Sequence, residues 1–185
     1  MKNFFAFGMI LTVASAVTAG EAVKSGPQTG DRLGAFYVTK CAGAETDGVA
    51  EGKNLCYRCR NGAKPQVVIF TRSTDKRIIE LVQQIDKAIA AHKDSRLTAF
   101  VNVLGEEKEG LSDAAKKLAK SSKATNVPFV VPNEFENGPD DYGISPKAAV
   151  TVILASELGV KANFAVSDIN DLKTAAVIAD LKKIL

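Results

Sequence analysis

A short apolar run, residues 67–70, is the feature that most constrains the fold of this chain. The run reads Val-Val-Ile-Phe and is typical of a strand buried on both faces, as in a parallel sheet covered by helices. Ser73 or Thr74 is placed to cap a helix directly after it. The apolar residues that then recur at helical spacing are Ile78, Leu81, Val82, Ile85 and Ile89. The pattern predicts a strand followed by an amphipathic helix.

The rest of the chain continues this alternation. Further strands are expected over residues 33–39, 97–104, 127–131, 149–154 and 160–166, and further helices over residues 111–119 and 169–179. The last two strands are joined by a turn at Gly159, so they pair antiparallel. Alternating strands and helices favour parallel crossover units. We therefore predict an α/β fold, a three-layer sandwich in which a central mixed β-sheet has helices on both faces.

The beginning of the chain has the pattern of a secretory signal peptide over residues 1–19. An apolar stretch, residues 4–13, follows a short charged start, and it is too short for a membrane span, which needs about 20 apolar residues. Cleavage is expected after Ala19, and no later stretch is suited to cross a bilayer. We therefore expect an exported protein, periplasmic or secreted, with a flexible leader over residues 20–32 and one domain over residues 33–185.

The charges of the chain are mixed along its length. Lysine and arginine number 24 and aspartate and glutamate 21, which gives a net charge of +3. No long basic block provides an electrostatic surface for a nucleic acid, so nucleic acid is not an expected partner.

Three cysteines, Cys41, Cys56 and Cys59, carry the chemistry that the sequence suggests. In an oxidising compartment disulfides persist, and an odd count leaves one thiol free or paired with another molecule. In the Cys56-x-x-Cys59 motif one thiolate can attack a substrate disulfide and the other can resolve the mixed disulfide. Nearby positive charge at Arg58 and Arg60 favours a thiolate. We assign Cys56 as the nucleophile and Cys59 as the resolving cysteine.

Two other interpretations of the motif remain open. The pair can form a structural disulfide that pins the long loop over residues 40–66. It can also contribute to a metal site with Cys41 as a third thiolate, although a fourth zinc ligand is lacking nearby. The motif is expected in a loop, without the helix N-terminus that favours a thiolate in redox sites. No metal ion or cofactor is predicted.

The order of elements resembles the thioredoxin-like superfamily over residues 33–185. The strand at 67–70 and the helix after it look like the pair that carries the active site in that family. Residues 150–154 and the turn at Gly159 look like its closing hairpin. Tyr142-Gly143-Ile144 and Val127-Pro128-Phe129 are similar to segments of peroxiredoxin-like members. The whole pattern is similar to exported thioredoxin-like proteins of planctomycete type, which carry a Cys-x-x-Cys ahead of the first core strand.

The chain also departs from this family at two places. Residues 71–76, where the family has its reactive cysteine, contain no cysteine, so peroxidase activity is not expected. Ala149 and Val150 stand where the family has a cis-proline, and we expect a trans bond there because a non-proline cis bond costs about 2.5–4 kcal/mol. The resemblance implies a thiol–disulfide oxidoreductase that uses Cys56 and Cys59 on protein thiols or disulfides. The alternative is a non-catalytic binding or scaffold domain with a structural Cys56–Cys59 disulfide.

Overall fold

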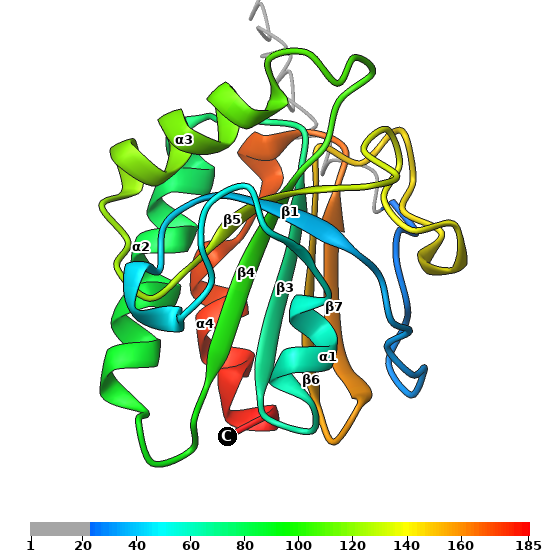
Figure 1. Cartoon of the computed structure of the whole chain (residues 1–185). Coiled ribbons are helices and arrows are strands. Elements are labelled where there is room, and N and C mark those ends of the chain that lie inside the picture. The colour runs from blue at the N-terminus through cyan, green and yellow to red at the C-terminus, as the bar shows by residue number, and fades with distance from the viewer. Residues whose placement is uncertain (1–22) are drawn as a thin grey trace, which may run out of the picture.

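The computed structural model describes residues 23–185, so the predicted signal peptide lies outside the described residues (Figure 1). Its centre is one seven-stranded sheet with the strand order β2-β1-β5-β4-β3-β6-β7. The strands are β1 Val38–Ala42, β2 Asn54–Leu55, β3 Gln66–Thr71, β4 Thr98–Val103, β5 Phe129–Pro132, β6 Val150–Ser156 and β7 Gly159–Val166. The α-helices are α1 Tyr57–Asn61, α2 Lys76–Ala91, α3 Leu111–Ser122 and α4 Thr174–Asp180, and the 3-10 helices are η1 Glu45–Asp47, η2 Asp140–Tyr142, η3 Ile169–Asp171 and η4 Leu181–Lys183.

Strand β3 is enclosed on every side. It pairs in parallel with β4 and antiparallel with β6, and all six of its residues are buried. Val67 and Ile69 face one layer of the core, and Val68 and Phe70 face the other. Such burial on both faces is what the continuous apolar run predicts.

The three longer helices cover one face of the sheet. The buried stripe of α2 is made of Ile78, Leu81, Val82 and Ile85, and it belongs to the same apolar cluster as Leu118 of α3 and Val177 of α4. Figure 1 shows α2 and α4 behind the sheet. The cap of α2 is Asp75, whose Oδ1 accepts a hydrogen bond from the amide of Arg77 at 3.0 Å, rather than the expected Ser73 or Thr74.

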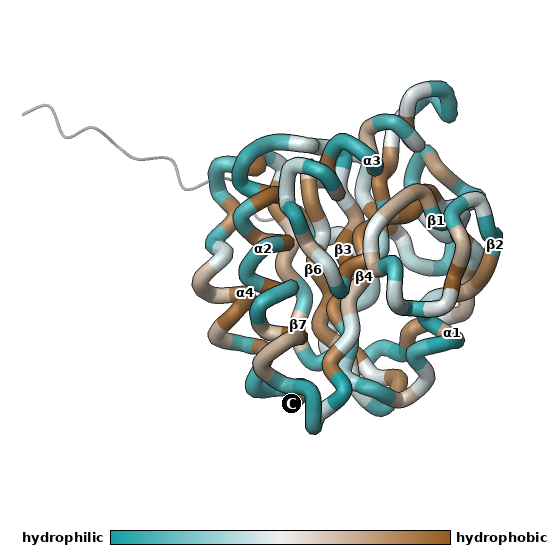
Figure 2. Tube along the Cα trace, turned by 60° about the vertical axis from the view of Figure 1, so that its left-hand side comes forward, coloured by the Kyte–Doolittle hydropathy of each residue, from teal (hydrophilic) through white to brown (hydrophobic). Residues whose placement is uncertain are grey.

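The opposite face of the sheet has a different cover. It is formed by the short helix α1 and by the chain before β1, which contribute Tyr57 and Phe36. Phe36 packs against Phe70, Phe100 and Tyr142 with ring centroids 5.0–5.9 Å apart. Figure 2 shows hydrophobic residues concentrated along the central strands and hydrophilic residues along the outer turns. The predicted mixed α/β sheet with helices on both faces is therefore confirmed, although within residues 23–185 α1 is the one α-helix on this second face.

Two boundaries differ from the sequence prediction. Residues 25–32, expected in a flexible leader, lie against the β6–β7 hairpin: Ser25 Oγ is 2.6 Å from Thr151 Oγ1, and the amide of Val160 donates to the carbonyl of Asp31 at 2.9 Å. This segment therefore belongs to the folded domain, because its polar groups find partners on β6 and β7. The first strand begins at Val38, five residues later than expected.

Within residues 23–185, no helix has the length and apolar character that a bilayer crossing requires.

We predict that Leu81→Ala destabilises the protein by about 2–5 kcal/mol, because Leu81 is fully buried between α2 and the sheet and its truncation leaves a cavity. The free energy of unfolding in urea measures the effect. The matched control is Glu80→Ala, one residue away on the exposed side of α2, which should change stability by less than about 0.5 kcal/mol. Equal losses in the two variants would contradict the packing described for α2.

Candidate functional site

The Cys-x-x-Cys motif forms a disulfide at the beginning of helix α1. Cys56 and Cys59 are bonded with their Cα atoms 5.2 Å apart. Cys56 caps the helix, and its Sγ accepts a hydrogen bond from the amide of Cys59 at 3.0 Å. The expectation of an irregular loop at this place is therefore wrong, because the sulfur of Cys56 serves as the cap of a five-residue helix.

The two sulfur-bearing residues differ sharply in exposure. Cys56 is only 8% exposed, whereas Cys59 is exposed. The helical turn explains the difference. Tyr57 and Asn61, four residues apart, face the protein, so Cys59 and Arg60 between them face solvent.

Tyr57 fixes α1 to the sheet. Its ring stacks on Phe100 of β4 with centroids 5.8 Å apart, and its hydroxyl donates to Asp47 Oδ2 at 2.6 Å. Two further bonds hold the helix, from Arg58 Nη2 to the carbonyl of Leu33 and from Arg60 Nη2 to the carbonyl of Asp47. The disulfide is therefore carried by a helix with anchors on three separate segments.

Lys40 of β1 provides a buried positive charge behind this helix. Its side chain is 1% exposed. The ammonium group donates to Asp47 Oδ1 at 2.8 Å, to the carbonyl of Val49 at 2.8 Å and to the carbonyl of Ala44 at 3.0 Å. All three donor positions are satisfied, as a buried ammonium requires. Lys40 and Tyr57 thus meet at the carboxylate of Asp47.

Burial alone raises the pKa of Asp47. The hydrogen bonds from Lys40, Tyr57 and the amide of Val49 outweigh this effect, so the pKa of Asp47 lies below its ordinary value. Burial raises the pKa of Tyr57, and its bond to the Asp47 carboxylate raises it further. Tyr57 therefore keeps its proton and donates a hydrogen bond to the ionised carboxylate of Asp47.

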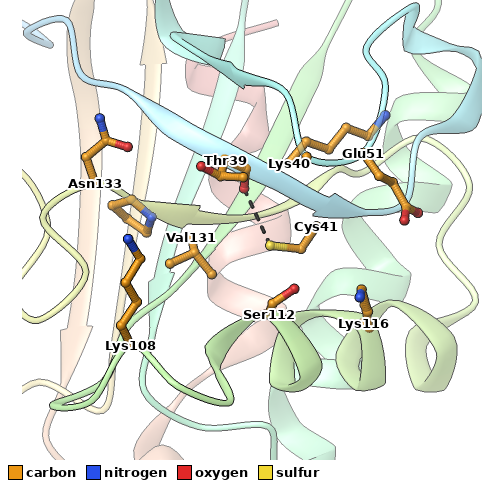
Figure 3. A pocket seen from close by; sticks show the side chains of 11 residues that line it. Thr39, Lys40, Cys41, Glu51, Lys108, Ser112, Lys116, Val131 and Asn133 are labelled. Carbon is orange, nitrogen blue, oxygen red and sulfur yellow. Dashed lines mark hydrogen bonds between the residues drawn. The ribbon is translucent and has the colours of Figure 1, made fainter.

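Cys41 lies away from the disulfide, on the face covered by α3. Figure 3 shows its thiol above Ser112 of α3. Both residues line a cavity of about 400 Å³. The thiol donates to the carbonyl of Thr39 at 3.5 Å, and burial raises its pKa. In the chain from residue 23 onward, no three His, Cys, Asp or Glu side chains gather as metal ligands. The metal site that joins Cys41 to the pair therefore finds no support.

Arg72 occupies the carboxyl end of β3, where the family has its reactive cysteine. Its guanidinium donates to the carbonyl of Glu136 at 2.7 Å and to Asn137 Oδ1 at 2.8 Å. Its amide donates to the carbonyl of Ala149 at 3.0 Å, at the position of the family's cis-proline. No peptide bond among residues 23–185 is cis. At this end of the sheet Arg72 therefore links the loop at Glu136 and Asn137 to the segment before β6.

Comparisons with known proteins bear on the fold. No family model matches the chain, and no curated protein sequence matches it. A thiol–disulfide oxidoreductase from Bacteroides fragilis is similar in structure, with a TM-score of 0.58 and 15% identity, over 84% of this chain and 100% of that one. AhpC from Mycobacterium tuberculosis is also similar, with a TM-score of 0.58 and 12% identity, over 84% and 96%.

A third similar structure is the yeast mitochondrial 1-Cys peroxiredoxin, with a TM-score of 0.56 and 10% identity, over 84% of this chain and 75% of that one. The fold of this chain is thioredoxin-like, as the resemblance in the sequence implied. In this chain the Cys-x-x-Cys pair lies ahead of β3, with Cys56 capping α1 and Cys59 within it, and Arg72 follows β3.

Sequence reasoning missed Lys40 and Asp47 as parts of this site. On an alternating strand a lysine is expected to face solvent, and an aspartate in a glycine-rich loop is expected to be a turn residue. The one available signal was Tyr57 inside the motif, since a buried tyrosine requires a partner for its hydroxyl.

We predict that Asp47→Ala destabilises the protein by about 3–5 kcal/mol, because it leaves the Lys40 ammonium buried without a counter-ion. Urea unfolding at neutral pH measures the loss. The double variant Lys40→Met/Asp47→Ala is the control, and it should recover most of the lost stability because it removes the uncompensated charge. A double variant less stable than Asp47→Ala would argue against the buried pair.

The lowered pKa of Asp47 also predicts a pH dependence of stability. In the unfolded chain this carboxyl returns to its ordinary pKa of 3.8, so the unfolded state binds the proton first as the pH falls. The stabilisation is present above that value and is lost as the pH falls through the lower pKa of the folded state. Urea unfolding from about pH 6 to about pH 2 should show a steeper loss in the wild type than in Asp47→Asn. The exposed Asp94→Asn is the control and should follow the wild type.

Proposed function

We propose that this chain is an exported thiol–disulfide exchange protein that uses Cys56 and Cys59 as its dithiol. The observation that carries the proposal is a disulfide with one exposed cysteine on a helix anchored to a thioredoxin-like framework. A buried disulfide is protected from attack, whereas an exposed one is open to a thiolate. The signal-peptide pattern of residues 1–19 supports export to an oxidising compartment.

The reaction requires only the two sulfurs and a thiol or disulfide of the partner. A partner thiolate attacks one sulfur of the disulfide and forms a mixed disulfide, and the electron pair of the broken S–S bond passes to the other sulfur. A second partner thiolate then releases the dithiol and leaves the partner oxidised. The reverse sequence reduces a partner disulfide.

The partners that we propose are thiols or disulfides of proteins. Cys59 is exposed and Arg60 beside it is also exposed, which leaves room for a polypeptide to approach. The B. fragilis neighbour bears the name of a thiol–disulfide oxidoreductase, which is consistent with the same class of reaction. Peroxidase chemistry is not proposed, because Arg72 and its two loop contacts occupy the place of the peroxidatic cysteine.

A second candidate function is the non-catalytic binding or scaffold domain. The observation that favours it is the set of anchors on α1, since Tyr57, Arg58 and Arg60 all bond to neighbouring segments. A disulfide held in this way could serve to stiffen the segment before β3. The same assay separates the two candidates.

We predict that the wild-type protein accelerates the reduction of insulin by dithiothreitol, followed by the turbidity of the released B chain. Cys56→Ser and Cys59→Ser should each lose this acceleration, because exchange needs both sulfurs. Cys41→Ser is the matched control, since Cys41 lies on the other face of the sheet and should leave the rate unchanged.

Two results would count against the exchange function. A wild type no faster than the reaction without protein would favour the scaffold domain. A rate that is unchanged in both Cys56→Ser and Cys59→Ser would show that some other group is responsible.

A further inference from the structure

We infer that Cys59, rather than Cys56, is the sulfur that forms the mixed disulfide with the partner, and that Cys56 is the resolving cysteine. This inference rests on the proposed exchange function and reverses the roles that the sequence order of the motif suggests. It follows from two independent features of α1, the exposure of the two cysteines and the hydrogen bond between them.

Access favours attack on Cys59. An incoming thiolate has to approach the sulfur from the side opposite the S–S bond, so the attacked sulfur must face solvent. Cys59 is exposed, whereas Cys56 is 8% exposed and is followed directly by the buried Tyr57. To bring Cys56 to the surface, α1 would have to give up the stacking of Tyr57 on Phe100 and the bond of Tyr57 to Asp47.

The hydrogen bond at the beginning of α1 favours Cys56 as the leaving group. When a partner thiolate bonds to Cys59 Sγ, the electron pair of the S–S bond moves to Cys56 Sγ. The amide of Cys59 already donates to that sulfur at 3.0 Å. A donor to the charged form lowers the pKa of a thiol, and a thiol of lower pKa leaves faster.

The difference in exposure selects Cys59 in the reverse direction as well. In the reduced protein the Cys59 thiolate attacks a partner disulfide, which yields a mixed disulfide at Cys59 and one free partner thiolate. The Cys56 thiolate then attacks Cys59 Sγ, the S–S bond of the protein forms again, and the second partner thiolate leaves. Cys56 needs no contact with the partner in either direction, which fits its burial.

Single-cysteine variants of the pair test this assignment with glutathione disulfide as the probe. In Cys56→Ser the remaining Cys59 should form a glutathione adduct at least about tenfold faster than Cys56 does in Cys59→Ser, because only Cys59 is accessible. Intact-protein mass spectrometry follows the adduct. The double variant Cys56→Ser/Cys59→Ser is the control for the buried Cys41 and should form no adduct in the same time.

A second measurement uses the wild type and does not depend on the folding of variants. The reduced protein is treated with less than one equivalent of iodoacetamide and then digested with chymotrypsin. Tyr57 lies between the two cysteines, so cleavage after it separates the peptide of Cys56 from that of Cys59. The label should be found on the Cys59 peptide.

The outcomes distinguish this inference from the function on which it rests. Insulin reduction by the wild type together with first labelling at Cys59 supports both. Insulin reduction together with first labelling at Cys56, or equal adduct rates in the two single variants, overturns the inference and leaves the exchange function standing. A wild type without insulin reduction, whose two single variants form no adduct, overturns both.

Discussion

The complete burial of strand β3 is the constraint on which the rest of the structure depends. Its residues Gln66–Thr71 are paired on both edges and covered on both faces. Helices α2, α3 and α4 supply the cover on one face, but in the described part of the chain the connections between strands place no long helix on the other. That second face is covered by the chain before β1 and by α1. The Cys-x-x-Cys helix takes part in this cover through Tyr57, which stacks on Phe100 of the neighbouring strand β4.

A buried ion pair fixes the position of the segments that cover this second face. Lys40 enters the interior from β1, and Asp47 binds both its ammonium and the hydroxyl of Tyr57. A buried charge is costly unless it is paired and fully hydrogen-bonded, so the loop over residues 44–49 has few alternative positions. Because Tyr57 is part of the motif, the same carboxylate fixes how the helix is turned. The orientation of α1 then determines that Cys59 is exposed while Cys56 is buried.

The position after β3, where the family that the sequence resembles has its reactive cysteine, has another role in this chain. After β3 the chain places Arg72, which links the loop at Glu136 and Asn137 to the segment before β6. A guanidinium with several donors is suited to hold irregular backbone together. The two ends of the same strand thus carry separate tasks, since the disulfide helix precedes β3 and a structural arginine follows it.

The sequence alone was sufficient to determine the mixed α/β sheet, from the apolar run at residues 67–70, the helical spacing after it and the closing hairpin. These patterns can be recognised because the spacing of apolar residues within a short segment indicates its secondary structure and its buried face. The motif Cys56-x-x-Cys59 likewise indicated a disulfide pair within a short span. Only the tertiary structure decided that Ser25 and its neighbours pack on the hairpin, that Lys40 is buried, and that Cys59 faces outward while Cys56 does not. These outcomes depend on partners far away in sequence, Thr151 for Ser25 and Phe100 for Tyr57, and no local pattern specifies which distant surface a residue will meet.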